Sequence, residues 1–234
     1  MTIKALTFDV FGTLVDWRGG VAREAEAILA PKGVRKDWGG FADAWRALYQ
    51  PAMRKVRRGE RPFTILDVLH RENLVDLLAA EGVEGLSETE IDHLNRAWHR
   101  LDPWPDVASG LHRLKSKFIL ASLSNGNIAL AVNLAKRSGL PWDVILGAEV
   151  TGAYKPSGEA YLGAARRLGL EPDECLMVAA HPTDLEAAAS RGFHTAYVHR
   201  PLEDGPGREA ARPALGTFDY CADDLLSLAD ILGA

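Results

Sequence analysis

Short apolar segments alternate with amphipathic segments along much of this chain of 234 residues, and this alternation constrains the fold most strongly. Strands that alternate with helices imply βαβ units, in which neighbouring strands run parallel in one sheet. The strand-like segments are almost continuously apolar, as expected of strands that are buried on both faces. We predict strands at residues 3–10, 118–123, 144–150, 175–180, 194–199 and 217–221.

Helical segments with one apolar face lie between these strands. They cover residues 128–137, 158–168 and 184–191, and the last of them stops at Gly192, a residue typical of helix C-termini. The segment 201–214 is rich in Gly and Pro, which predicts a surface loop. The fold class is therefore α/β, with a Rossmann-like parallel sheet as its core.

The region from about residue 17 to residue 101 breaks the alternation, because it has helical patterns but no convincing strand. We interpret it as a helical cap domain, residues 17–101, inserted into a Rossmann-like catalytic core formed by residues 1–16 and 102–234. Ser87 and Glu90 have the spacing of a capping box at the start of its last helix. The predicted helices of the insert are 20–31, 40–50, 62–81 and 87–101.

The composition excludes several classes of protein. The net charge of -5 and the 25% of charged residues give no indication of binding to nucleic acid or to a membrane surface. Two cysteines do not form a disulfide framework in a chain of this length. We see no signal peptide and no apolar run near the ~20 residues of a membrane helix. We therefore expect a cytoplasmic enzyme that acts on a small molecule.

Polar side chains follow four of the predicted strands near their carboxyl ends. In a doubly wound sheet, ligands bind beyond these ends. Because four separate strand ends each contribute polar groups, we expect these groups to surround one site. They are Asp9 after the first strand, Ser124 and Asn125 after the second, Lys155 after the third, and His181 and Asp184 after the fourth.

These motifs, in this order, resemble the haloacid dehalogenase superfamily, and most closely its L-2-haloacid dehalogenase branch. The run FDVFGTLVD begins at Phe8, LSNG begins at Leu123 and YKP surrounds Lys155, while Asp184 lies a few residues beyond the fourth strand. The resemblance extends over nearly the whole chain, and the helical insert lies where that family has its cap.

The resemblance implies hydrolytic removal of halide from short 2-haloacids through a covalent ester on Asp9, with inversion at C2 and a preference for the L enantiomer. It implies no organic cofactor, and homodimers are common in the family. Thr13 matches the threonine of the first motif. Arg46 resembles the cap arginine that meets the halogen and the carboxylate of the substrate. Tyr161 also matches this branch.

Physical reasoning gives roles to the core residues. A carboxylate can displace a halide if it is held ionised and poorly hydrated. Lys155 would keep Asp9 ionised, because a nearby opposite charge favours the charged form. Water would then attack the ester, with Asp184 or His181 as the base.

The substrate itself needs donors on two sides. The leaving halide gains negative charge in the transition state, so donors should converge on it, and Arg46 and Asn125 are the candidates. Ser124 and the backbone N–H groups near Phe11 are the candidates for holding the substrate carboxylate.

Two alternatives stay open, a phosphatase of the same superfamily and a non-catalytic member that binds a small carboxylate or a protein. Phosphatases of the superfamily place a second Asp two residues after the nucleophile, where this chain has Phe11. They also tend to have a second carboxylate near the fourth strand to hold Mg²⁺, where this chain has Ala180. A hard cation needs several oxygen ligands, so the sequence argues against phosphoryl transfer and against a strong metal site.

The end of the fourth strand departs from the pattern of most family members. Many have Ser-Ser-Asn where this chain has Ala179-Ala180-His181, and a subset that shares the latter includes members that cleave C–F bonds. His181 would be an additional donor to the halide, so fluoroacetate is one candidate substrate.

Some of these residues also have simpler interpretations. Asp184 could provide favourable charge at a helix N-terminus, where Thr183 and Glu186 have the spacing of a capping box. Ser124 could cap the following helix, and Arg46 could be a solvated helix residue.

Overall fold

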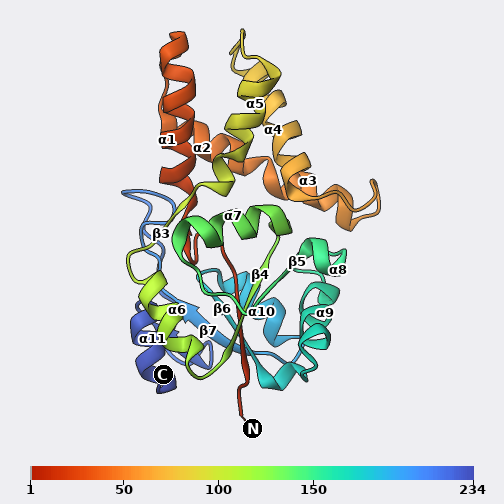
Figure 1. Cartoon of the computed structure of the whole chain (residues 1–234), viewed down its shortest axis with the longest axis vertical. Helices are drawn as coiled ribbons and strands as arrows, with labels where there is room; N and C mark the ends of the chain where they lie inside the picture. Colours follow the sequence, from red (N-terminus) through yellow and green to blue (C-terminus); the bar gives the residue numbers. More distant parts are fainter. Residues whose placement is uncertain (1) are drawn as a thin grey trace.

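A computed structural model describes residues 2–234, and in it six strands form one parallel sheet (Figure 1). The strand order is β5-β4-β1-β6-β7-β8, so β1 lies between β4 and β6 in the middle of the sheet. This arrangement confirms the α/β fold class predicted from the sequence. The strands are β1 (Ala5–Phe8), β4 (Ile119–Ser124), β5 (Val144–Gly147), β6 (Cys175–Ala179), β7 (His194–Val198) and β8 (Tyr220–Ala222).

Helices cover both faces of the sheet. Leu6 and Phe8 of β1 point into one apolar cluster, with α6, α7 and α11, while Ala5 points into the other, with α9 and α10. Neighbouring residues of a strand face opposite sides, so this central strand is buried on both. The helices are α6 (Val107–Lys115), α7 (Ile128–Ser138), α9 (Gly158–Leu168), α10 (Pro182–Ala189) and α11 (Leu225–Leu232), and a short 3₁₀ helix, η3 (Pro172–Glu174), precedes β6.

The helical insert, residues 17–101, stands beyond the carboxyl ends of the strands (Figure 1). A short antiparallel ladder, β2 (Val15–Asp16) with β3 (Asp102–Pro103), joins the two points where the chain passes between sheet and insert. The insert consists of α1 (Trp17–Leu29), η1 (Ala30–Lys32), α2 (Trp38–Ala47), α3 (Tyr49–Arg57), α4 (Leu66–Ala80), α5 (Glu88–Asn95) and η2 (Arg96–His99).

The insert differs from its predicted helices in two informative places. The predicted helix 40–50 is two helices that meet at Leu48, and this break sets α3 off from α2. The predicted helix 87–101 ends at Asn95 and continues as the 3₁₀ turn η2. Its capping box is confirmed, because the hydroxyl of Ser87 and the carboxylate of Glu90 each accept a bond from the other residue's backbone N–H.

The predicted strand 144–150 is wrong in its second half. The strand β5 ends at Gly147, and the short helix α8 (Ala148–Thr151) follows. Gly147 has a φ of +151°, and a Cβ there would lie 2.4 Å from the carbonyl oxygen of Ser124. Only glycine permits this turn so close to the neighbouring strand. The turn leads into the loop that bears Lys155.

In the described part of the chain, no helix combines the length and the apolar character needed to cross a membrane.

Candidate active site

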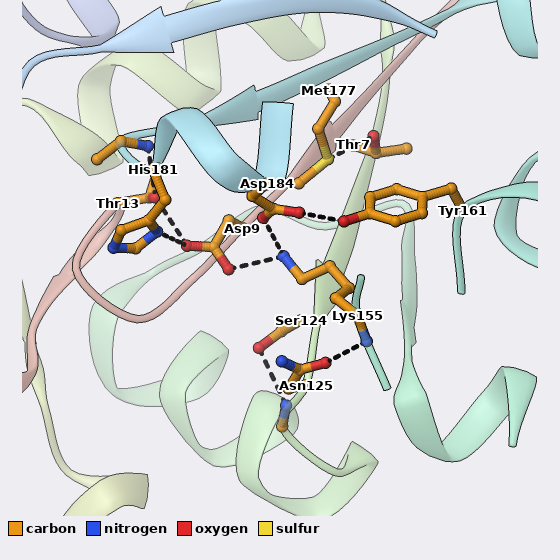
Figure 2. A network of polar contacts seen from close by, with 12 residues as sticks. Thr7, Asp9, Thr13, Ser124, Asn125, Lys155, Tyr161, Met177, His181 and Asp184 are labelled. Carbon is orange, nitrogen blue, oxygen red and sulfur yellow. Dashed lines mark hydrogen bonds and ion pairs between the residues drawn. The ribbon is translucent and has the colours of Figure 1, made fainter. Parts of the chain in front are cut away.

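The structure brings the polar groups from the strand ends together around one cavity of about 200 Å³. Asp9 follows β1, Asn125 follows β4, and His181 and Asp184 follow β6, while Lys155 reaches in from the loop after α8 (Figure 2). The cavity is smaller than the roughly 300–1,000 Å³ of sites for drug-sized ligands. The other predicted residues on its wall are Phe11, Arg46 and Tyr161.

Asp9 is a buried carboxylate that accepts hydrogen bonds on both oxygens (Figure 2). Its Oδ1 lies 2.9 Å from Nζ of Lys155, and its Oδ2 lies 2.8 Å from Oγ1 of Thr13 and 3.1 Å from Nδ1 of His181. Burial alone would raise the pKa of Asp9, but the charge of Lys155 and the hydrogen bond from His181 outweigh it and hold the pKa well below its usual range. Asp9 is therefore an ionised, poorly hydrated carboxylate at neutral pH, as a nucleophile must be.

Lys155 lies between two carboxylates, because its ammonium pairs with Asp184 as well as with Asp9. Burial would lower the pKa of Lys155, but the negative charges of Asp184 and Asp9 outweigh it and raise the pKa. The backbone N–H of Lys155 donates to Oδ1 of Asn125 at 2.8 Å. That bond occupies the acceptor end of the Asn125 amide, so its Nδ2 donor is the end available to a ligand in the cavity.

Asp184 is held from a second side by Tyr161, whose hydroxyl donates to Oδ1 of Asp184 at 2.6 Å. Burial and the charge of Asp184 raise the pKa of Tyr161, so this hydroxyl stays protonated as a donor. The helix α10 begins at Pro182 with His181 as its N-cap residue. The predicted capping box of Thr183 and Glu186 is therefore wrong, although Asp184 does lie in the first turn.

His181 faces a carboxylate at each ring nitrogen. Its Nδ1 lies 3.1 Å from Oδ2 of Asp9, and its Nε2 lies 2.9 Å from Oε1 of Glu203. Because an ionised carboxylate only accepts, both ring nitrogens must bear hydrogen. Burial would lower the pKa of His181, but the bonds to the two carboxylates raise it to about 10. His181 is therefore an imidazolium at neutral pH and has no free lone pair with which to act as the base, while the role of Asp184 as the base stays a prediction.

Arg46 lies in a box of aromatic rings on the insert side of the cavity. Its Cζ is 4.2 Å from the ring centre of Tyr49, 5.3 Å from Trp17, 5.8 Å from Phe11 and 6.0 Å from Trp98. Such cation–π contacts stabilise a guanidinium that is withdrawn from water. Its Nη1 is buried and has no hydrogen-bond partner among residues 2–234. An anion in the cavity would complete this group.

Thr13 and Ser124 lie behind the cavity wall. The hydroxyl of Thr13 donates to Asp9 and accepts from the backbone N–H of Ala180 at 2.9 Å, so it fixes the nucleophile. The hydroxyl of Ser124 accepts from the backbone N–H of Gly126 at 3.0 Å and tightens the turn after β4 (Figure 2). Ser124 is not among the residues that line the cavity, and its predicted contact with a substrate carboxylate stays a prediction.

Two further side chains were missed by the sequence analysis. Tyr49 lies on the cavity wall three residues after Arg46, and this helical spacing was an available signal. Glu203 comes from the segment 201–214, which was predicted only as a surface loop and has no periodic pattern. In the part of the chain that the structure describes, no group of three or more His, Cys, Asp or Glu side chains is arranged to hold a metal ion.

A parallel sheet with an ionised aspartate beyond its central strand suits a hydrolase that works through a carboxylate. The family model of the haloacid dehalogenase-like hydrolases matches residues 3–192, and the chain belongs to this family. Within the family it is similar to 2-haloacid dehalogenases and also to a phosphatase.

The crystal structure of a defluorinating L-2-haloacid dehalogenase superimposes with a TM-score of 0.96 at 44% identity, covering 99% of this chain and 96% of that chain. The (S)-2-haloacid dehalogenase 4A of Burkholderia cepacia is 30% identical over 205 residues, which are 85% of this chain and 84% of that protein. Hexitol phosphatase A of Escherichia coli (strain K12) is 28% identical over 214 residues, 87% of this chain and 86% of that protein.

Proposed function

We propose that this protein is a 2-haloacid dehalogenase, which hydrolyses the carbon–halogen bond of short 2-haloacids through an ester on Asp9. The observation that carries the proposal is the Asp9 carboxylate, which Lys155 keeps ionised at the wall of a small cavity. Relatives at 30–44% identity that are named 2-haloacid dehalogenases support the same reaction. At the position of a phosphatase's second Asp, the buried ring of Phe11 offers no acid.

In the first half of the reaction, a carboxylate oxygen of Asp9 attacks C2 of the substrate, and the halide leaves with the bonding electron pair. Asp9 is buried beside the ring of Phe11 on the cavity wall, so water competes weakly for the nucleophile. Arg46 and Nδ2 of Asn125 donate to the departing halide or to the substrate carboxylate. Both donors face the cavity before the substrate arrives, so little reorganisation is needed in the transition state.

In the second half, water attacks Cγ of Asp9 and Asp184 takes its proton. Asp184 can do this because it is an acceptor on the cavity wall that Lys155 and Tyr161 hold in place. Thr13 and His181 donate to Oδ2 of Asp9, where negative charge develops. The product is a 2-hydroxyacid, and Asp9 is restored.

The proposal includes the division of the chain into a cap domain, residues 17–101, and a core of residues 1–16 and 102–234. The β2–β3 ladder at the two crossings supports that division. A cytoplasmic location and a homodimer also belong to the proposal, and sedimentation equilibrium tests the homodimer.

A halide-release screen tests the function. The substrates are chloroacetate, bromoacetate, fluoroacetate and both enantiomers of 2-chloropropionate, and Asp9→Asn is the control. We expect chloride and bromide release, with the L enantiomer preferred, and none above background in the control. Fluoride release would extend the substrate range to fluoroacetate, as the similarity to a defluorinating enzyme suggests. Mg²⁺-dependent turnover of p-nitrophenyl phosphate without halide release would instead favour a phosphatase.

A further inference from the structure

Glu203 enters the site from the loop after β7, on the side of His181 that faces away from Asp9. One oxygen, Oε1, accepts from Nε2 of His181 at 2.9 Å and from Nε1 of Trp17 at 3.1 Å. The side chain is only 12% exposed. Because Trp17 opens α1, this single carboxylate oxygen links the first helix of the insert to a side chain that contacts the nucleophile.

The backbone leaves room for this carboxylate at Gly12. Gly12 has a φ of +83°, and a Cβ at this position would lie 1.9 Å from Oε1 of Glu203. The backbone conformation favours glycine there, and the missing side chain leaves the space that the carboxylate of Glu203 occupies. The carboxylate packs against the loop between Asp9 and Thr13, so Glu203 is part of the wall behind the nucleophile.

The loop that bears Glu203 is fixed on both sides. Before it, the buried Arg200 pairs with Asp106 through two bonds of 2.8 Å and donates to the carbonyl oxygen of Thr13 at 2.8 Å. After it, Arg208 pairs with Asp43 of α2 at 2.8 Å. Both ends of the loop are therefore anchored, and these anchors hold the carboxylate of Glu203 in place between them.

The negative charges around His181 favour its protonated form. Three carboxylates lie around it, and Lys155 and Arg46 supply two positive charges, so the imidazolium supplies the third. The Asp43–Arg208 pair and the exposed Asp204 also line its outer side. The three carboxylates are Asp9 beyond β1, Asp184 on α10 and Glu203 on the loop.

We propose that Glu203 is a positioning residue that holds His181 doubly protonated, with its Nδ1–H directed at Oδ2 of Asp9, and that this accelerates hydrolysis of the ester. The inference rests on the proposed function. Oδ2 of Asp9 already accepts two hydrogen bonds and Oδ1 only one, so Oδ1 is the oxygen freer to bond to C2 of the substrate. Oδ2 then becomes the carbonyl oxygen of the ester.

Hydrolysis of the ester passes through an oxyanion on Oδ2 of Asp9. Water forms a bond to Cγ of Asp9, its proton passes to Asp184, and the carbonyl electron pair moves to Oδ2. The hydroxyl of Thr13 and the imidazolium of His181 stabilise that oxyanion. When the carbonyl re-forms, Oδ1 leaves with the product and takes the proton from Asp184, and the second water proton leaves the new oxygen of Asp9 for solvent, which restores the carboxylate. Losing one oxyanion donor costs about 10²–10³-fold, so losing its support should cost somewhat less.

The test compares Glu203→Gln with Asp204→Asn, which removes the neighbouring exposed carboxylate of the same loop, using chloroacetate as the substrate. For Glu203→Gln we expect a burst of one chloride per active site and then a steady rate lower by about 10–100-fold. A carboxymethyl ester on the Asp9 peptide should accumulate in quenched samples. The alkaline limb of kcat should lie at lower pH in Glu203→Gln than in the wild type, because glutamine permits a neutral imidazole. Asp204→Asn should match the wild type.

Glu203→Asp keeps the charge and should retain an alkaline limb close to that of the wild type, and it replaces Glu203→Gln if that variant does not fold. Wild-type kinetics and an unshifted pH profile in Glu203→Gln would overturn this inference alone. Loss of the burst together with the steady rate would also overturn it, because the defect would then precede the ester. Absence of chloride release from the wild type would instead overturn the proposed function.

Discussion

The two sides of the cavity differ in how their charged side chains are paired. On the sheet side, Lys155 lies between the carboxylates of Asp9 and Asp184, and His181 lies between Asp9 and Glu203. On the insert side, Arg46 is surrounded by aromatic rings, and its buried Nη1 has no partner among the described residues. Each carboxylate on the sheet side therefore already contacts a cation without a ligand, whereas the Nη1 of Arg46 has no such contact among the described residues.

In the proposed reaction, the sheet side prepares the nucleophile and the insert side binds the substrate. A carboxylate nucleophile has to be ionised before the substrate arrives, so its compensating charges are built into the core. A buried charge without a partner costs several kcal/mol, and cation–π contacts offset about 0.5–2 kcal/mol of it. The substrate carboxylate or the departing halide offsets the remaining cost. The affinity for the substrate should therefore depend on Arg46, and the rate of the chemical step on Lys155.

Removal of the amine between the two carboxylates should have the largest effect. In Lys155→Met, the like charges of Asp9 and Asp184 would raise the pKa of Asp9, and kcat should fall by about 10³-fold or more. The free energy of unfolding should fall by about 3–5 kcal/mol in urea titrations, because a buried pair loses one partner. The exposed Lys136→Met is the matched control. Unchanged kcat at neutral pH would show that Lys155 is not needed to keep Asp9 ionised.

Arg46→Met should reveal the opposite pattern. We expect kcat/KM for chloroacetate to fall by about 10²-fold, chiefly through KM, because the substrate loses a charged hydrogen bond. Stability should hold or rise, because the variant removes a half-buried cation whose Nη1 has no partner among residues 2–234. Arg54→Met, an exposed change on the neighbouring helix, should leave both unchanged. A large loss of stability with an unaltered KM would show that Arg46 is structural.

The pH dependence of stability gives a smaller effect on the sheet side. The pKa of His181 is raised from 6.5 to about 10 in the folded protein. Its stabilising contribution is therefore fully present below about pH 6.5 and is lost as the pH rises through about 10. Thermal unfolding from pH 6 to pH 11 should show this decline in the wild type and a flatter profile in His181→Gln. Identical profiles would mean that the imidazolium adds nothing to the folded state.

Ser124→Ala should have the smallest effect, because its hydroxyl faces the turn after β4 and not the cavity. We expect kcat/KM within about twofold of the wild type and a loss of about 0.5–1.5 kcal/mol in stability. Asn125→Ala, its neighbour on the cavity wall, should lose at least about tenfold in kcat/KM. A tenfold rise in KM for Ser124→Ala would restore the predicted contact with the substrate carboxylate.

The sheet side was largely predictable from the sequence, and the reason is topological. Parallel strands end at one edge of a sheet, so the alternation of strands and helices is enough to place Asp9, Lys155 and Asp184 together. Short loops after those strands are enough to bring these three side chains into contact. We predicted the correct strand end for Ser124. Its rotamer, which decides whether the hydroxyl faces the turn or the cavity, cannot be predicted from the sequence.

Glu203 could not be predicted in the same way. It lies in an irregular loop, and its contact with His181 depends on how Arg200 and Arg208 fix that loop. No periodicity links these residues. The protonation state of His181 was missed for the same reason, because it follows from the second carboxylate that this loop supplies.

The central claim, a covalent bond between Asp9 and the substrate, is tested most directly by one turnover in H₂¹⁸O with enzyme in excess over chloroacetate. Peptide mass spectrometry and product analysis then locate the label. The account predicts one ¹⁸O atom in the side chain of Asp9 and an unlabelled hydroxyl in the first glycolate formed. Label in the hydroxyl of the product, with none in Asp9, would mean that water attacks C2 directly and would contradict the account.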